Sequence, residues 1–487
     1  MNGIAITFWS YTLVVFAIGL ISVYYSRNTK KDFFLADRGL GAWVAGLSGA
    51  ASVESGWVTM GLVGSGFKNG IGVYWVVPAT ALSFAFIWFV IAPRLGKLAT
   101  EQNSVTMTDV LAGGNGSGLS RWIRLLSVSI SVGMLTLYVA AQLKSAGDLF
   151  QAAFDWQFSV GVLAGLAIAL VYTITGGFRA VAWTDVVQAA LMIFAMVIVP
   201  FLLVQQLGGP SVFWQKVSEV PVEGYDQWTA GKSGLALFAF LTLYLGIPLG
   251  NLGQPHLAVR LMAARDSRAI FRGGMISVAW VTILFSGAVT LGIAAKLLVE
   301  NQRLAPFENP EHSLMMIATS GQLVPGWLGG LMVAAALAAI CSTVDSQLLV
   351  AASNVSSDLV DNPMVLGTQQ RSERFIWWAD RITVALVAVI AMGFGLSNQQ
   401  SIFDFVLNYG FAGLGAAFGP ALFFRLLRPN ADGNAAVFAS MLAGLATVVV
   451  WNLWDLKAYS YNLPPAVLMA TVAGAAFIRR SPQPDPV

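Results

Sequence analysis

Charged residues are scarce in this chain. Only 10% of its 487 residues are Asp, Glu, Lys or Arg, whereas 57% are hydrophobic. A water-soluble protein carries about 25% charged residues, so this composition excludes a soluble protein. The mean hydropathy of +0.71 indicates the same. Because helices satisfy their own backbone hydrogen bonds in lipid, we predict an all-α protein with many membrane-spanning segments.

The residues that most enzymes use are also scarce. Cys341 is the only cysteine, which rules out an intrachain disulfide. The two histidines, His256 and His312, lie far apart, and no Ser-His-Asp arrangement or metal-binding spacing accompanies them. No polar stretch exceeds about thirty residues, so no separate catalytic or signalling domain is expected. We therefore predict that the protein is not an enzyme and has no nucleic-acid partner.

Apolar runs of about 17 residues or more, long enough to cross a bilayer, predict thirteen transmembrane helices. Most of the 27 basic residues fall in alternate loops, which lie on the inner side if the N-terminus is outside. This distribution predicts an N-out/C-in topology, which requires an odd number of spans. The spans are predicted at roughly 5–25, 40–66, 70–92, 123–149, 158–175, 182–206, 233–256, 273–297, 322–349, 373–396, 401–426, 433–453 and 463–478.

The second span contains a carboxylate, Glu54, in the middle of an apolar segment. Such a group costs several kcal/mol in lipid unless it faces the bundle interior or a wet cavity. Its neighbours Ser52, Ser55 and Gly56 loosen a helix and offer backbone groups to a ligand. Transporters build ion and substrate sites at such broken helices. The alternative is a softened packing face with a buried, protonated Glu54.

The seventh span has a second interruption. Three Gly and two Pro lie within residues 246–255, and this combination breaks a helix. Corresponding breaks five spans apart predict an inverted-repeat transporter. The predicted organisation is a peripheral helix and inner loop (1–39), a first repeat of spans 2–6 (40–206), an outer loop (207–232), a second repeat of spans 7–11 (233–426), and two peripheral helices with a C-terminal tail (427–487).

Other polar residues interrupt the spans at helical spacing. Ser342, Asp345 and Ser346 form one stripe on span 9. Their oxygens suit a small hard cation, although Ser also bonds to its own helix. Tyr138 and Gln142 share a face of span 4 because they are four residues apart. These two faces are candidate ion and solute sites.

Several short motifs occur in order at the expected spans. The chain resembles the sodium/solute symporter family over nearly its full length, most closely the sodium/proline branch. The stretches that carry the resemblance are Ala51-Ser52 with Ser55-Gly56-Trp57, Trp183-Thr184-Asp185 with Val187-Gln188, Gly253-Gln254-Pro255-His256 with Arg260 and Met262-Ala263-Ala264, Ser342-Thr343 with Gln347-Leu348-Leu349-Val350, and Gly415-Ala416-Ala417-Phe418-Gly419-Pro420.

This resemblance implies a LeuT-like five-plus-five inverted repeat with alternating access, and one or two Na+ sites. The first site, between spans 2 and 9, is implied to use the carbonyls of Ala51, Glu54 and Ala339 and the hydroxyls of Ser342 and Thr343. Family members with a further sodium site imply a second one at Asp185, Ser342, Asp345 and Ser346.

The substrate positions depart from the proline branch. Its members have an aspartate where this chain has Val53, and an apolar residue in place of Glu54. Their aromatic positions in span 7 are Ile247 and Asn251 here, although Tyr138 matches. We therefore expect a substrate other than proline. The residues expected to bind it are Ser55, Gly56, Tyr138, Gln142, Ile247 and Asn251.

These observations together predict a sodium-coupled symporter of the cell membrane, which in a bacterium is the inner membrane. Its expected partners are sodium ions, the lipid bilayer and a small polar, amino-acid-like solute. Proton coupling is an alternative, because Glu54 and Asp345 could carry protons in place of sodium. The Ser342-Thr343 pair favours sodium, since a proton carrier does not need it. A third possibility is a solute sensor that acts through a partner protein.

Overall fold

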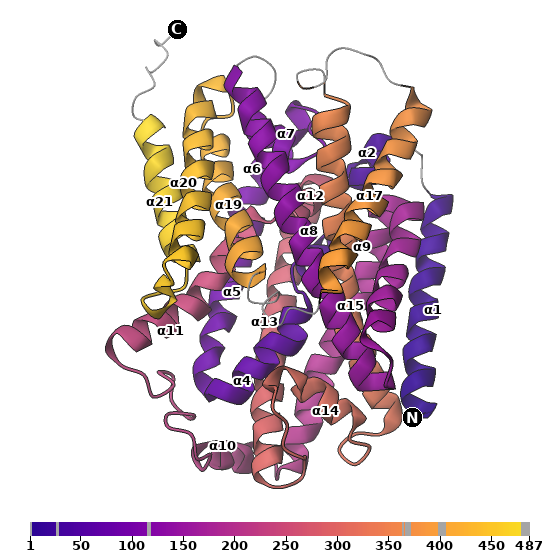
Figure 1. Ribbon diagram of the computed structural model, residues 1–487, viewed down its shortest axis with the longest axis vertical. Helices are drawn as coiled ribbons and strands as arrows, with labels where there is room; N and C mark the ends of the chain where they lie inside the picture. Colours follow the sequence, from indigo (N-terminus) through magenta and orange to yellow (C-terminus); the bar gives the residue numbers. More distant parts are fainter. Residues whose placement is uncertain are drawn as a thin grey trace.

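The computed structural model describes residues 2–25, 29–113, 118–362, 365, 372–397 and 406–478, and within them the chain is helical with no β-strand (Figure 1). The main helices are α1 (Asn2–Tyr24), α2 (Lys30–Leu35), α3 (Ala42–Ala51), α4 (Val63–Asn69), α5 (Val76–Phe86), α6 (Ala92–Glu101), α7 (Met107–Ala112), α8 (Gly118–Phe154), α9 (Phe158–Gln206), α10 (Pro210–Ser218), α11 (Gly234–Gly246), α12 (Pro255–Ala263), α13 (Ser267–Glu300), α14 (Ser313–Thr319), α15 (Gly326–Ser353), α17 (Glu373–Gly395), α19 (Ala412–Leu427), α20 (Asn434–Leu453) and α21 (Leu463–Ile478).

The prediction of an all-α membrane protein is confirmed. In the described part of the chain, ten helical segments are long and apolar enough to cross a membrane, and α3 and α21 are shorter apolar helices. The element α9 consists of two helices that meet at Gly177, where φ is +57° and ψ is −150°, and these correspond to predicted spans 5 and 6. The exact number of thirteen spans and the N-out orientation stay predictions.

The predicted break in span 2 is confirmed. Helix α3 ends at Ala51, and the chain resumes as a π-helical turn, η2 (Trp57–Leu62), which continues into α4. Between them, residues 52–56 leave the regular helix, so their backbone groups no longer all bond within it. π-helical turns often accompany functional sites. This break places Glu54 inside the bundle, where it is 3% exposed.

The predicted break in span 7 is confirmed as well. Helix α11 ends at Gly246, and a 3₁₀ turn, η5 (Ile247–Gly253), follows. Helix α12 then begins with Pro255, which is favoured at a first helical position because it lacks an N–H group. A Cβ at Gly253 would lie 2.3 Å from the Leu414 carbonyl oxygen, so η5 and α19 pack in backbone contact.

Helix α15 is the central element, because nearly every one of its residues is buried. It packs against α9, α8 and α1. Its middle is rich in alanine, and small residues allow membrane helices to approach closely. This approach brings Ser342 and Thr343 against the break after α3.

Helix α13 packs against α3, α4 and α9 and supports the first break from the other side. At Gly292 a Cβ would lie 2.0 Å from the carbonyl oxygen of Val63, so only glycine permits this contact. The helix is capped by Asp266, whose side chain accepts a hydrogen bond from the N–H of Ala269 at 2.7 Å. That bond and the neighbouring Arg265 hold the pKa of Asp266 below its ordinary value.

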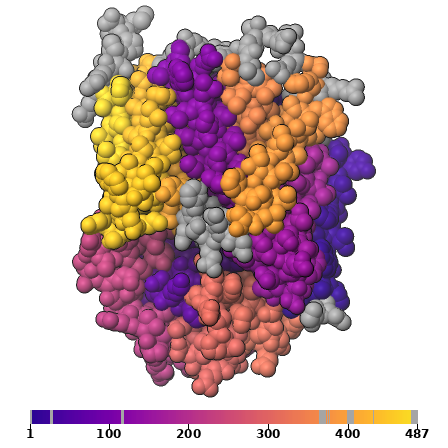
Figure 2. Space-filling view, in the orientation of Figure 1, coloured from indigo at the N-terminus to yellow at the C-terminus, as the bar shows by residue number. Residues whose placement is uncertain are grey.

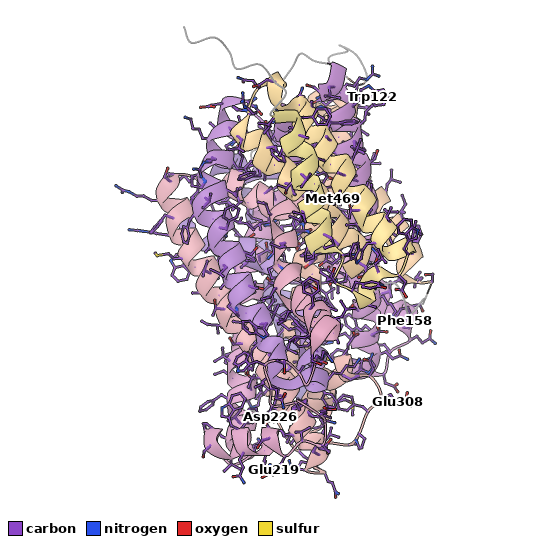
Figure 3. All side chains as sticks on the ribbon, turned by 90° about the vertical axis from the view of Figure 1, so that its left-hand side faces the viewer. Trp122, Phe158, Glu219, Asp226, Glu308 and Met469 are labelled. Atoms are coloured by element: carbon purple, nitrogen blue, oxygen red, sulfur yellow. The ribbon has the colours of Figure 1, made fainter. Side chains whose placement is uncertain are left out.

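Ion pairs, both buried and partly exposed, link the helices at one end of the molecule. Arg124 on α8 contacts Asp358 and also Asp109, the latter at 2.6 Å. Lys30 on α2 pairs with Asp361 at 2.7 Å. In Figure 3 Trp122, close to Arg124 in the chain, lies at the upper end, whereas Glu219, Asp226 and Glu308 lie at the lower end. The loops predicted to be inner are thus gathered at one end.

The peripheral helices cover the sides of this bundle. In Figure 2 helix α8 lies on the visible surface between α17 on one side and the pair α20 and α21 on the other. The packing of α8 against α17 and α20 agrees with this view. These continuous helices therefore form much of the surface on the face that Figure 2 shows.

Candidate functional site

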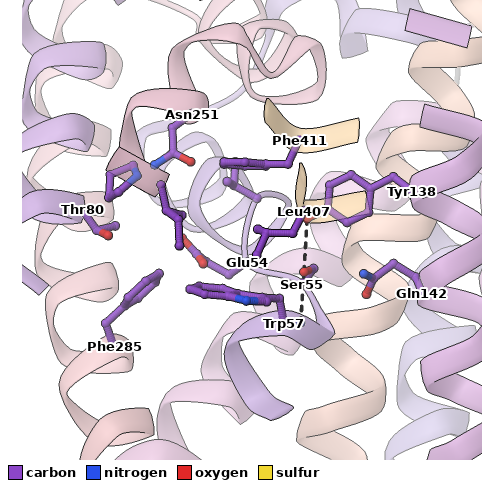
Figure 4. A pocket seen from close by; sticks show the side chains of 13 residues that line it. Glu54, Ser55, Trp57, Thr80, Tyr138, Gln142, Asn251, Phe285, Leu407 and Phe411 are labelled. Atoms are coloured by element: carbon purple, nitrogen blue, oxygen red, sulfur yellow. Dashed lines mark hydrogen bonds between the residues drawn. The ribbon is translucent and has the colours of Figure 1, made fainter. Parts of the chain in front are cut away.

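A cavity lies where the two interrupted helices face each other, and Figure 4 shows its lining. Its free volume is about 30 Å³, room for on the order of two water molecules. The break after α3, α5, α8, η5, α13 and the π-helical turn η8 (Val406–Phe411) each contribute residues. The thirteen lining residues are Val53, Glu54, Ser55, Trp57, Thr80, Tyr138, Gln142, Ile247, Pro248, Asn251, Phe285, Leu407 and Phe411.

Glu54 lies within this cavity. Figure 4 shows its side chain above Trp57, with Asn251 and Phe411 on the opposite side. No hydrogen bond or ion pair from another described residue reaches its carboxylate, which thus faces the cavity without a protein partner. A buried carboxyl group in this situation either holds a proton or needs a cation or a hydrogen-bond donor from a ligand.

Two hydrogen bonds from α8 hold the break in place. The hydroxyl of Tyr138 donates to Ser55 Oγ at 3.2 Å, and Gln142 Oε1 accepts from the N–H of Gly56 at 3.0 Å (Figure 4 marks the first). The other side-chain atom of Gln142, Nε2, is buried and has no partner among the described residues. One end of this amide therefore fixes the backbone while the other is free to donate to a solute.

The residues expected to bind solute lie close together. Five of the six line the cavity, namely Ser55, Tyr138, Gln142, Ile247 and Asn251. The sixth, Gly56, contacts it through the bond to Gln142. Their roles in binding stay predictions.

Sequence reasoning missed the aromatic part of the lining. Trp57 was assigned only to a stretch that carries the family resemblance, and no role was predicted for Phe285 or Phe411. Thr80 was missed as well, because a single hydroxyl in an apolar run is weak evidence for a site. In the structure its buried hydroxyl has no partner among the described residues. Aromatic residues are common in apolar helices, so no spacing rule distinguishes those that face a cavity.

The predicted first ion site is assembled between α15 and the break. Ser342 Oγ donates to the carbonyl oxygens of Ala51 (3.0 Å) and Ala339 (3.2 Å), and Thr343 Oγ1 donates to that of Ala339 at 3.1 Å. All four residues are fully buried. Every ligating atom in this group is a neutral oxygen, the donor set that a hard monovalent cation prefers. The hydrogen bonds thus join four of the five predicted groups, and the Glu54 carbonyl is not among them.

The predicted second site contains a residue that the sequence reasoning had not assigned to it. Arg260 lies on α12 and donates to Asp185 Oδ2 at 3.0 Å, to Ser346 Oγ at 2.5 Å and to Ser48 Oγ at 3.0 Å. Ser346 in turn donates to Asp345 Oδ1 at 3.1 Å. A guanidinium therefore already supplies one positive charge between the two carboxylates.

Two further contacts complete this cluster. Tyr172 donates to Asp345 Oδ2 at 2.7 Å, and Ser48 donates to Asp185 Oδ2 at 2.6 Å. The other carboxylate oxygen, Asp185 Oδ1, is buried without a partner among the described residues. The cluster has two carboxylates for one guanidinium, and this free oxygen is the atom that could accept a further cation.

A cavity between two broken helices, with an oxygen-rich site beside the first break, in an all-helical membrane bundle is the arrangement of a secondary transporter. The pattern of the sodium:solute symporter family matches residues 33–444, and the chain belongs to that family. It is accordingly a membrane transporter, with sodium as the family's coupling ion, and not an enzyme.

Its curated relatives are bacterial proteins of the cell membrane with similar length. The sodium/proline symporter of Salmonella typhimurium is 33% identical over 452 residues, which is 92% of this chain and 87% of the relative. The sodium/proline symporter of Escherichia coli is 31% identical over 97% of this chain and 92% of the relative. The osmoregulated proline transporter OpuE of Bacillus subtilis is 31% identical over 94% and 91%.

Solved structures show the same fold at low sequence identity. A substrate-bound, outward-open, Na+-coupled sialic acid symporter has a TM-score of 0.81, with 15% identity and 98% of each chain covered. The transporter MhsT in complex with L-phenylalanine has a TM-score of 0.52, with 15% identity, covering 89% of this chain and 98% of its own. The fold of this protein is therefore LeuT-like.

Proposed function

We propose that the protein uses an inward sodium gradient to import a small polar organic solute by alternating access. The observation that carries this is the shared helix break. Residues 51–56 contribute carbonyl oxygens to the candidate ion site and side chains to the solute cavity. Binding at one site therefore changes the backbone of the other, which is the physical requirement for coupling. A potential of 100 mV adds about 2.3 kcal/mol per charge moved inward.

We assign one sodium ion to Ala51, Ala339, Ser342 and Thr343, with the Glu54 carbonyl as the proposed fifth ligand. A second ion remains a candidate at Asp185, because its Oδ1 atom is buried and free. Arg260 already provides a positive charge there. The proposed sodium coupling therefore depends on the first site alone, and the second site is an additional candidate.

The solute itself is assigned only as small, polar and organic. The expectation that proline is excluded finds no support in the comparisons, since relatives 30–33% identical are named proline transporters. Proline is therefore among the first solutes to test, although Glu54, Ile247 and Asn251 give the cavity its own chemistry.

The test is transport by purified protein in proteoliposomes. With an inward sodium gradient and a negative interior, we expect the solute to induce an inward current. This current should disappear when potassium replaces sodium at the same membrane potential. A panel of amino acids, sugars, carboxylates, amines and nucleobases identifies the solute. If no solute in the panel evokes sodium-dependent current or counterflow, while a solute still stabilises the protein thermally, the chain is a sensor and the proposal is wrong.

Substitution of cavity residues should separate solute binding from sodium binding. Gln142→Ala removes the acceptor for the Gly56 N–H, and Asn251→Ala removes a polar group from η5. We expect each to raise the solute half-saturation concentration at least tenfold, about 1.4 kcal/mol, with sodium half-saturation changed less than threefold. Ser129→Ala on the exposed side of α8 is the control. Equal shifts in both half-saturation values would place these residues outside the solute site.

A further inference from the structure

We infer that the solute is an organic ammonium cation carrying alkyl groups on its nitrogen, such as a quaternary or tertiary amine. This inference rests on the proposed symport and narrows its substrate class. The first observation is the charge of the cavity lining. Among the thirteen described residues that line the cavity, Glu54 is the only one that is formally charged, and none is Lys, Arg or His.

No basic residue in the described part of the chain pairs with this carboxylate. The buried carboxylates of Asp185 and Asp358, in contrast, pair with Arg260 and Arg124. Glu54 has no such partner, although it is 3% exposed. Because an unpaired buried carboxylate is costly, a cationic solute would gain the full attraction of Glu54, which a neutral solute cannot.

Four of the other lining residues are aromatic. Trp57, Tyr138, Phe285 and Phe411 line the cavity around Glu54, and the rings of Trp57 and Phe285 lie 6.4 Å apart at 52° (Figure 4). The electron-rich faces of aromatic rings attract cations, and cages of such rings bind alkylated ammonium ions. A primary ammonium has three N–H groups to satisfy, whereas an alkylated one presents methyl and methylene groups that suit these walls.

A solute with its own carboxylate is disfavoured by the same lining. It would meet Glu54 as a like charge without a basic residue among the described lining residues to offset it. The backbone donors of the break are also occupied: the N–H of Gly56 bonds to Gln142, and that of Trp57 bonds to Ser55 Oγ at 3.1 Å. The cavity lining therefore selects net positive charge over a zwitterion. Its free volume of about 30 Å³ has to enlarge to admit the alkyl groups, as the proposed alternating access allows.

The experiment compares solutes of matched shape and different charge on the full-length protein in sodium. Choline is the cation, 3,3-dimethyl-1-butanol its uncharged carbon analogue, glycine betaine the zwitterion with the same trimethylammonium group, and proline a secondary-ammonium zwitterion. Thermal shift and titration measure binding, and sodium-dependent current in proteoliposomes measures transport. We expect choline to bind at least tenfold more tightly than each of the other three, and to be transported.

Variants of the cavity assign the effect to the residues. Glu54→Gln keeps the shape of the side chain and should lower choline affinity at least tenfold while leaving the affinity for dimethylbutanol unchanged. Glu54→Asp should retain part of the preference. Trp57→Leu should weaken choline binding more than Trp57→Phe, since phenylalanine keeps an aromatic face.

Three results would overturn the inference. One is sodium-driven transport of proline or glycine betaine with affinity equal to or above that of choline, which would leave the proposed symport intact. Another is that choline does not bind. The third is that Glu54→Gln changes only the sodium half-saturation value, which would make Glu54 an ion-site residue. Choline binding without any transport would support the cavity assignment and contradict the proposed symport instead.

Discussion

Replacing Arg260 with leucine is expected to cause the largest loss of stability of any single change in the bundle interior. Its guanidinium lies between two helices and is fully buried, as is the carboxylate of Asp185 with which it pairs at 3.0 Å. Removing one partner of a buried ion pair costs about 3–5 kcal/mol, because the other charge is left without compensation. Most of the protein should therefore fail to accumulate in a folded form.

The charges around Arg260 make the two partners unequal. Two carboxylates, Asp185 and Asp345, share this one guanidinium, the latter through Ser346. Arg260→Leu leaves both without a cation, whereas Asp185→Asn leaves Arg260 with Asp345 nearby. We therefore expect Asp185→Asn to lower the melting temperature by less than half as much as Arg260→Leu.

A double substitution tests whether the loss of stability comes from the uncompensated charge rather than from the lost side chain. Arg260→Leu with Asp185→Leu replaces the pair by apolar side chains, and such replacements are often neutral or stabilising. Its yield and melting temperature in detergent should exceed those of Arg260→Leu alone. Arg272→Leu, a change of the same kind at an exposed position of α13, is the control. Strictly additive losses across Arg260→Leu, Asp185→Leu and the double variant would contradict a direct charge interaction.

The fold could be predicted from the sequence to a large extent. Apolar runs located the helices, and the Gly and Pro residues of 246–255 located the break after α11, because these residue types limit the backbone directly. The family resemblance predicted that Ser342 lies near Ala51, and its hydroxyl donates to the Ala51 carbonyl oxygen; that these groups bind sodium stays a prediction. The interruption of α9 at Gly177 falls between the predicted spans 158–175 and 182–206, because glycine adopts a positive φ that breaks a helix.

The candidate site was predicted less completely. The position of Arg260 among Asp185, Ser48 and Ser346 depends on how α12 packs against α3, α9 and α15, and no local pattern encodes that packing. The aromatic lining of the cavity was not predicted, for a similar reason. A phenylalanine such as Phe285 has the same local signature whether it faces lipid, protein or a cavity, and only the tertiary structure distinguishes these environments.

Substitution of the hydroxyls of α15 should have the largest effect on sodium dependence. Ser342→Ala removes the Oγ atom that bridges Ala51 and Ala339, and Thr343→Val removes the second hydroxyl while keeping its volume. Each loses one neutral oxygen from a site that has no carboxylate ligand, so the remaining ligands cannot compensate by charge. We expect each change to raise the sodium concentration for half-maximal uptake at least tenfold, which corresponds to about 1.4 kcal/mol.

Loss of an ion ligand has to be distinguished from loss of packing, because Ser342 also joins α15 to the break in the structure. Melting temperatures without sodium measure the packing contribution, and the additional stabilisation on adding sodium measures binding. Ser353→Ala is the matched control, since this buried hydroxyl on α15 bonds only to its own helix, at Val350. Thr343→Ser should retain sodium dependence near that of the unmodified protein. If Ser353→Ala shifts the sodium half-saturation value as far as Ser342→Ala does, the hydroxyls act through the helix and the proposed ion site is wrong.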